Sequence, residues 1–397
     1  MRRGAWHQFG DKSQLCAIEQ LNNGTGVGVI ISPRDLSWTG AINYSKKYHE
    51  LGAHVLIDQQ FFVPDFLNKN LTSYPISQYR KTISLLHDIS DSDLSKFATQ
   101  LEKINRDLST DGLIAPAVVH EAGRPDINRL NKRLFSVAKQ IGDNLGVPTY
   151  ATIILGNSAT SSDQIMYSTL SQATALNSDG WYFGFEFDRE RIPSSRRAIL
   201  RFCKAGITLA STGKPILHAY AGPMALLSLG FGVTGVGIGH RQNLWHFTRG
   251  RWGPTATQGG GGNAPARFFS ESIWGTIVDP DETSQLNTAT RSRVLTHSPF
   301  STPVASSLQW SRWDAGKHLV SVICKTAEKL AVNNNPHAIA NDVITSLSDA
   351  VALHNRIQNA GLSLSDNTFS YQQNWIDALN ALIRDHSLDF DYLDLLM

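Results

Sequence analysis

The chain has 397 residues, 41% of them hydrophobic, which is enough for one large domain or two ordinary ones. Its 36 lysines and arginines nearly balance its 34 aspartates and glutamates, which excludes a strongly basic coat for nucleic acid but leaves room for a local basic groove. The three cysteines lie far apart, which excludes zinc-knuckle spacing and disfavours a disulfide framework. No apolar run approaches the roughly 18 residues of a membrane span. The two arginines near the N-terminus are not followed by the apolar run of a secretory signal, so we expect a cytoplasmic protein.

Short apolar runs recur along the chain, and amphipathic segments separate most of them. The runs are almost continuously apolar rather than alternating, which is typical of parallel strands covered on both faces. We expect strands at residues 26–32, 53–60, 111–119, 148–156, 179–187, 215–221 and 232–239, and a weaker eighth at 303–310. The expected helices between them include residues 38–52, 126–146, 161–177 and 194–211.

Repetition of strand and helix at this count predicts an α/β fold of the (β/α)8 TIM-barrel type. The alternative is an open, doubly wound sheet. We expect the barrel over residues 1–330, with long loop insertions at about 61–110 and 248–302. A helical C-terminal extension is expected over residues 331–397.

The segment 232–247 reads GVTGVGIGHRQNLWHF and is rich in glycine. It does not match the dinucleotide-binding fingerprint, because His240 stands where the last glycine of G-x-G-x-x-G should be. We therefore interpret it as a strand in which glycine permits close packing inside the barrel.

Polar residues follow the apolar runs, where barrel enzymes place their active sites. Asp58, Glu186 and His218 lie within apolar strands, where an unpartnered charge would be costly, and we predict that they share one pocket as catalytic residues. Asp58 or Glu186 would be the nucleophile or general base, and His218 would orient it or act as an acid. Further residues at the strand ends are predicted to bind substrate: Arg34, Glu121, Asp188, Tyr220, His240, Arg241 and Asn243. For several of these polar residues the alternative is a structural role as a helix cap or an ion-pair partner.

The sequence predicts neither a metal nor a cofactor. A metal-dependent hydrolase of this fold would carry an H-x-H pair at the end of its first strand, and this chain has ISPRD after the run at 26–32.

A loop with three arginines, Arg249, Arg251 and Arg267, surrounds four consecutive glycines at 259–262. We predict that it is mobile in the free protein and ordered by an anionic ligand. The alternative is a structural loop whose arginines pair with acidic residues farther along, namely Asp279, Asp281 and Glu282.

Three segments, YATIILGNS, SDGWYFGFEFDRE and HAYAGPMALLSLGFGVTGVGIG, resemble strands and a helix of the tRNA-guanine transglycosylase superfamily, which includes DNA 7-deazaguanine transglycosylases. The earlier LGAHVLIDQQFF is also similar. The nucleophilic aspartate of that family would fall on Gly237, its second catalytic aspartate would fall in IAPAVVH, and its zinc motif is absent. The resemblance implies a barrel that has moved its catalytic carboxylates or lost catalysis.

The leading functional prediction is N-glycosidic chemistry on a nucleobase or nucleoside, free or in nucleic acid, with Arg241 holding a phosphate or carboxylate. One alternative is an O-glycoside hydrolase. Another is a catalytically inert barrel that binds nucleic acid or protein within a modification or defence complex. The expected partners are thus a nucleobase-like molecule or nucleic acid, with a protein partner or a second copy of the chain left open and no membrane.

Overall fold

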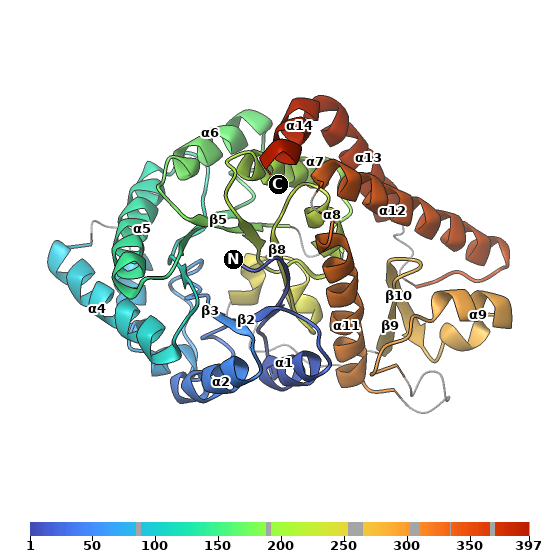
Figure 1. Ribbon diagram of the computed structural model, residues 1–397, viewed down its shortest axis with the longest axis horizontal. Coiled ribbons are helices and arrows are strands. Elements are labelled where there is room, and N and C mark those ends of the chain that lie inside the picture. The colour runs from blue at the N-terminus through green and yellow to red at the C-terminus, as the bar shows by residue number, and fades with distance from the viewer. Residues whose placement is uncertain are drawn as a thin grey trace.

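The computed structural model describes residues 1–84, 89–187, 192–252, 265–301, 310–333, 335–365 and 370–396. Eight parallel strands form a nearly closed barrel surrounded by helices (Figure 1), which confirms the predicted (β/α)8 fold. The strands pair in the order β3-β2-β1-β8-β7-β6-β5-β4. The Asp111 N–H donates to the Val55 carbonyl at 2.9 Å, across the seam between the two end strands. The strands are β1 (Gly4–Gln8), β2 (Gly28–Ile31), β3 (His54–Ile57), β4 (Leu113–Ile114), β5 (Thr149–Leu155), β6 (Gly180–Phe185), β7 (Ile216–His218) and β8 (Gly235–Ile238).

A helix follows each strand and covers the barrel from outside (Figure 1). In chain order the eight are α1 (Ser13–Asn22), α2 (Trp38–Glu50), α4 (Asp91–Leu108), α5 (Pro125–Leu145), α6 (Asp163–Thr174), α7 (Arg196–Ala210), α8 (Ala225–Leu229) and α11 (Arg312–Ala331). Shorter helical turns lie in the connections: η1 (Leu71–Ser73), η2 (Ser77–Tyr79), α3 (Arg80–Ser84), η3 (Gly222–Met224), η4 (Gln242–Leu244), η5 (Arg249–Trp252), η7 (Thr283–Gln285) and α9 (Thr288–Val294).

The first strand, β1, was not predicted from the sequence. All five of its residues are buried, but two of them, His7 and Gln8, are polar, so the segment lacks the apolar run that marks the other strands. The ring of His7 bonds to the Thr25 carbonyl at 3.0 Å, while Gln8 lies near Tyr182 of β6. With β1 included, the barrel has its eight strands. The expected strand at 303–310 falls almost entirely outside the described residues.

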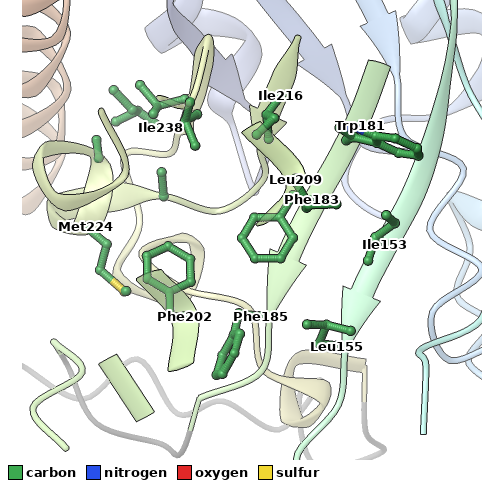
Figure 2. Packing of buried hydrophobic residues seen from close by; sticks show 14 of the residues in the cluster. Ile153, Leu155, Trp181, Phe183, Phe185, Phe202, Leu209, Ile216, Met224 and Ile238 are labelled. Atoms are coloured by element: carbon green, nitrogen blue, oxygen red, sulfur yellow. The ribbon is translucent and has the colours of Figure 1, made fainter. Parts of the chain in front are cut away.

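Side chains of the strands alternate between two apolar cores. One fills the inside of the barrel, and its strand members include Trp6, Ile30, Leu56, Tyr182 and Leu217. The other lies between strands and helices. Figure 2 shows part of it, where alternate residues of β6 meet α7 and their neighbours: Trp181, Phe183, Phe185, Phe202 and Leu209.

Two glycines of β8 face the inner core. A Cβ atom on Gly235 would lie 3.0 Å from the Trp6 indole nitrogen, and one on Gly237 would lie 3.0 Å from the Gln8 side-chain oxygen. Both contacts are tighter than side chains normally tolerate. The structure thus confirms that glycine in this segment serves close packing.

The two long insertions have structure of their own. The first contains α4, which is the barrel helix between β3 and β4. The second contains an antiparallel hairpin that was not predicted, β9 (Ala266–Ser270) with β10 (Gly275–Asp279), which packs against α11. Three further helices, α12 (Pro336–Asn359), α13 (Ser370–Asp385) and α14 (Ser387–Leu396), fold back so that α13 contacts α7 and α12 contacts α8. Within the described part of the chain, no helix has the length and apolar character needed to cross a membrane.

Candidate active site

Asp58 lies at the C-terminal end of β3 and points into the barrel, two residues beyond the inward-facing Leu56. The hydroxyl groups of Tyr182 and Tyr220 donate to its Oδ2 at 2.8 and 3.1 Å, and the Gln60 N–H donates to its Oδ1 at 2.9 Å. Its side chain is almost completely buried. The carboxyl group is therefore held by three hydrogen bonds that reach it from β6, from the connection after β7 and from its own loop.

Burial raises the pKa of the Asp58 carboxyl to about 6, because the charged form is poorly solvated inside the barrel. The hydrogen bonds from Gln60, Tyr182 and Tyr220 and the positive charge of Arg251 oppose this shift. A carboxyl group with such a pKa exchanges a proton near neutral pH, which is what general acid–base catalysis requires.

Replacing Tyr182 with phenylalanine is expected to raise the pKa of Asp58 above that of the wild type, because a hydrogen bond to the charged form is lost. Infrared titration of the carboxyl C=O band, assigned by its loss in Asp58→Asn, measures this. Tyr74→Phe is the matched control, since the buried Tyr74 hydroxyl donates to the Leu36 carbonyl instead. An unchanged titration in Tyr182→Phe would contradict the assigned contact.

The backbone is strained on both sides of this carboxylate. Gln60 has φ 54° and Tyr220 has φ 56°, and both values lie in the left-handed region that residues other than glycine rarely occupy. Both residues contact Asp58, and the Gln60 amide group also donates to the Tyr220 hydroxyl at 3.2 Å. Strain of this kind is found where a fold holds functional groups in place.

Glu186 lies at the same end of the barrel, just beyond β6, and is 6% exposed. The Asn157 N–H donates to its Oε2 at 3.1 Å, and the Arg249 guanidinium lies 2.7 Å from the same oxygen. Arg249 also bonds to Glu121, which accepts a further hydrogen bond from Ser158. One arginine thus bridges two carboxylates that lie in the connections after β4 and β6.

A polar pocket of about 170 Å³ opens beside Glu186. This is smaller than a whole ligand site of the usual 300–1,000 Å³, so it suits one group of a ligand, such as a sugar ring or a phosphate. The residues around it include Asn157, Thr160, Glu186, Ser195, Arg197 and Arg201.

Aromatic side chains fill the barrel mouth next to Asp58. Tyr220 packs against Trp252, with 5.9 Å between ring centroids, and Phe62 and Phe247 complete the cluster. The buried Arg251 donates to Asp35 at 2.6 Å and lies over the Tyr220 ring. The four residues of η5 therefore cover the mouth and attach to it through one arginine on each side.

Several buried nitrogen atoms at this mouth have no hydrogen-bond acceptor among the described residues. They are Gln8 Nε2, Arg251 Nε and Nη1, and Trp252 Nε1. Buried donors are nearly always satisfied in native proteins, so this concentration of free N–H groups is unusual. It favours a ligand or water with acceptor oxygens or nitrogens.

The prediction that three catalytic residues share one pocket is wrong for His218. Its neighbour Leu217 faces the barrel interior, so His218 faces the helices, where its ring packs against Phe183 and Phe202. Its Nδ1 lies 2.7 Å from the Ser228 hydroxyl, and burial lowers its pKa to about 3. Asp58 and Glu186 both belong to the mouth, but His218 is a neutral residue of the outer core.

The residues predicted to bind substrate divide into three groups. Tyr220 and Glu121 belong to the networks of Asp58 and Glu186, and Arg34 lies near Arg251, paired with Asp35 at 3.3 Å. A second group lies apart from Asp58: His240 contacts Ser13 and Trp313, Arg241 pairs with Asp11, and Asn243 is exposed. Asp188 lies outside the described residues.

Two of the three loop arginines, Arg249 and Arg251, pair with acids other than those expected for a structural loop. Arg249 pairs with Glu121 and Glu186, and Arg251 pairs with Asp35. The glycines at 259–262 lie outside the described residues, so the predicted response of the loop to an anion stays a prediction.

Some residues of the site were missed from the sequence. Tyr182 and Gln8 carry no motif, and Gln8 becomes a candidate only when β1 is recognised as a strand. No cluster of three or more histidine, cysteine, aspartate or glutamate side chains suited to a metal ion occurs among the described residues.

Comparison with known proteins adds no family assignment. No protein-family model matches the sequence, and no curated protein does so either.

Proposed function

We propose that this protein carries out N-glycosidic chemistry on a nucleobase-bearing substrate at the C-terminal end of its barrel. The observation that carries the proposal is Asp58, a buried carboxyl group with a pKa of about 6, held between two tyrosine hydroxyls on the face where barrel enzymes act. The resemblance to transglycosylases points to the same substrate class, with the carboxylates supplied from other positions.

In the proposed reaction the protonated Asp58 donates its proton to a ring nitrogen of the base. The base leaves with the electron pair of the glycosidic bond, and positive charge develops on the sugar. Glu186, next to a pocket of the size of a sugar ring, stabilises that charge. Water or a second base then forms the new bond to the sugar carbon, and its released proton returns to Asp58.

The substrate reaches Asp58 only if the cover moves, because Asp58 is 2% exposed beneath the aromatic cluster. The segment that would move is η5. Its Arg249 and Arg251 attach it to Glu186 and Asp35 by ion pairs, which can break and form again. Movement of such segments commonly gates barrel enzymes. The unpaired N–H of Gln8, which is not part of η5, would then face an acceptor of the base.

A second candidate is an inert barrel that serves as a binding subunit. One observation favours it: the mouth beside Asp58 is filled by Phe62, Phe247 and Trp252 in the structure. In that case Asp58 and Glu186 are structural carboxylates that hold the mouth closed.

The test is base release or base exchange, measured by mass spectrometry after incubation with ribonucleosides, transfer RNA and duplex DNA. Nitrophenyl glycosides in parallel report O-glycoside hydrolysis. We expect a free base from at least one nucleic-acid or nucleoside substrate and no nitrophenol. Nitrophenol alone would favour the hydrolase, and binding of nucleic acid without any cleavage would favour the inert barrel.

Replacing Glu186 with glutamine is expected to lower base release by at least about tenfold, because a charge that stabilises the sugar is lost. Glu282→Gln is the matched control, since Glu282 is also buried but accepts the Val278 N–H near the hairpin. The thermal midpoint of both variants is measured to separate folding from chemistry. Equal activity of Glu186→Gln and wild type would assign Glu186 a structural role.

A further inference from the structure

A second pocket lies between α5 and α6, on the outside of the barrel, where these two helices flank β5 (Figure 1). Its volume is about 430 Å³, which is within the range of sites for small organic ligands. None of its lining residues belongs to the networks of Asp58 or Glu186. It is therefore a separate cavity with its own chemistry.

The pocket exists because small residues line the wall. The strand β4 ends at Ile114, and the small residues Ala115, Pro116 and Ala117 follow it. Ala151 of β5 and Ala173 of α6 continue the wall, so methyl groups stand where larger side chains would fill the space. Phe135 and Leu176 supply the larger apolar surfaces. An apolar space of this kind favours an apolar occupant over water.

The polar groups in the wall already have partners. The His120 Nδ1 lies 3.2 Å from the Asn128 oxygen, and the Asn131 amide group bonds to the backbone of Val118 at 2.9 Å in both directions. Burial lowers the pKa of His120, which favours the neutral form of its ring. The deep part of the pocket therefore offers apolar contact rather than hydrogen bonds.

The edge of the pocket is basic. Arg129 and Lys132 of α5 line it, and both side chains are exposed. Other cations of the same helix have acidic partners, as Arg133 does with Asp91 at 2.7 Å, whereas no carboxylate of the described residues pairs with Arg129 or Lys132. An apolar interior with uncompensated positive charge at the opening complements an apolar molecule that carries an anionic group.

We propose that this pocket binds a small amphipathic organic anion, such as a medium-chain or aryl carboxylate. The apolar body lies between α5 and α6 against the alanine wall, and the carboxylate faces Arg129 and Lys132. This inference is independent of the glycosidic function proposed above.

The test compares octanoate with 1-octanol by isothermal titration calorimetry on the full chain. We expect saturable octanoate binding that is tighter than octanol binding and weaker in 0.5 M salt, because screening weakens the contribution of exposed charges. In Arg129→Gln/Lys132→Gln, the preference for octanoate is expected to fall roughly fivefold, in keeping with two exposed charge contacts. Arg133→Gln, one residue from Lys132 but paired with Asp91, is the control and keeps the preference.

Two variants that fill the space test the position of the apolar body. Ala173→Leu places a larger side chain in the buried wall of the pocket. Ala175→Trp places one at the exposed edge, where the substitution leaves the protein core unchanged. Each is expected to lower octanoate affinity at least about tenfold, because apolar contact supplies most of the binding free energy. Absence of saturable octanoate binding, wild-type affinity in Ala175→Trp, or equal binding of octanol and octanoate would overturn the proposal.

Discussion

Replacing Asp58 with asparagine is expected to reduce base release at least about 100-fold while the protein stays folded, because a positioned acid–base group contributes roughly 10²–10⁴ in rate. Asparagine has nearly the same shape and still accepts hydrogen bonds from Tyr182 and Tyr220, but it cannot donate a proton to a leaving base. Activity is measured with the substrate identified by the release assay, and folding by thermal unfolding. Asp107→Asn, a partly exposed aspartate of α4 that pairs with Lys103, is the control.

The same substitution has a defined effect on stability. The pKa of Asp58 is about 6 in the native state against an ordinary value of 3.8, so the native protein binds more protons than the unfolded chain between these values. The contribution of protonated Asp58 to stability is therefore complete below pH 3.8 and is lost as the pH rises through about 6. At neutral pH the buried charge of Asp58 costs about 3 kcal/mol, because the pKa of this carboxyl rises from 3.8 to about 6 on folding. Asp58→Asn removes this cost but also loses the hydrogen bond from the Gln60 N–H, so its stability at pH 7 is expected to lie within about 2 kcal/mol of wild type.

Two outcomes would contradict this assignment. Full activity of Asp58→Asn would show that Asp58 is not the acid, and unfolding at pH 7 would show that the charged carboxylate is needed to hold the mouth together. Only the second result would favour the inert barrel, because full activity would mean that another group supplies the proton.

Lowering the pH from about 6.5 to about 4 is expected to destabilise the protein strongly. Burial lowers the pKa of four histidines, to about 4 for His7 and His318 and to about 3 for His218 and His240. Below pH 6.5 the unfolded chain takes up protons that the native state does not, so native stability falls until the native pKa values are reached. At pH 4 each histidine costs about 3 kcal/mol, so the four together cost about 13 kcal/mol, which is comparable to the roughly 5–15 kcal/mol that stabilises a typical domain. The opposite effect of Asp58 involves a single proton.

Denaturant unfolding at a series of pH values measures this dependence. His218→Phe removes one of the four groups and fits a site already formed by Phe183 and Phe202, so its stability should depend on pH less steeply by about one proton. His337→Phe, at a partly exposed position on α12 beside Phe390, should keep the wild-type slope. Constant stability between pH 6.5 and 4.5 would show that these histidines become protonated without unfolding.

The sequence by itself was sufficient for the barrel, because the signals for it are local. Apolar runs mark seven of the eight strands, and amphipathic segments between them mark helices α2, α5, α6 and α7. The close packing at Gly235 and Gly237 was also predicted from local sequence. Both glycines lie in an apolar run without a dinucleotide-binding fingerprint, which favours a packing role for glycine. The strand β1 was missed because its pattern is not local. His7 and Gln8 are polar, and their partners Thr25 and Tyr182 come close only in the folded barrel.

Tertiary structure alone decided which polar side chains meet. Asp58 and His218 both follow apolar residues, yet one faces two tyrosine hydroxyls inside the barrel and the other faces the phenylalanines of the outer core. Which face a residue takes depends on the register of its strand in the sheet, and a shift of one position reverses it. The partners of Arg249 lie 63 and 128 residues away in the chain, so no local pattern encodes them. Long-range ion pairs, the closed mouth and the pocket between α5 and α6 all arise from packing between elements, and packing is set by the whole fold rather than by any one segment.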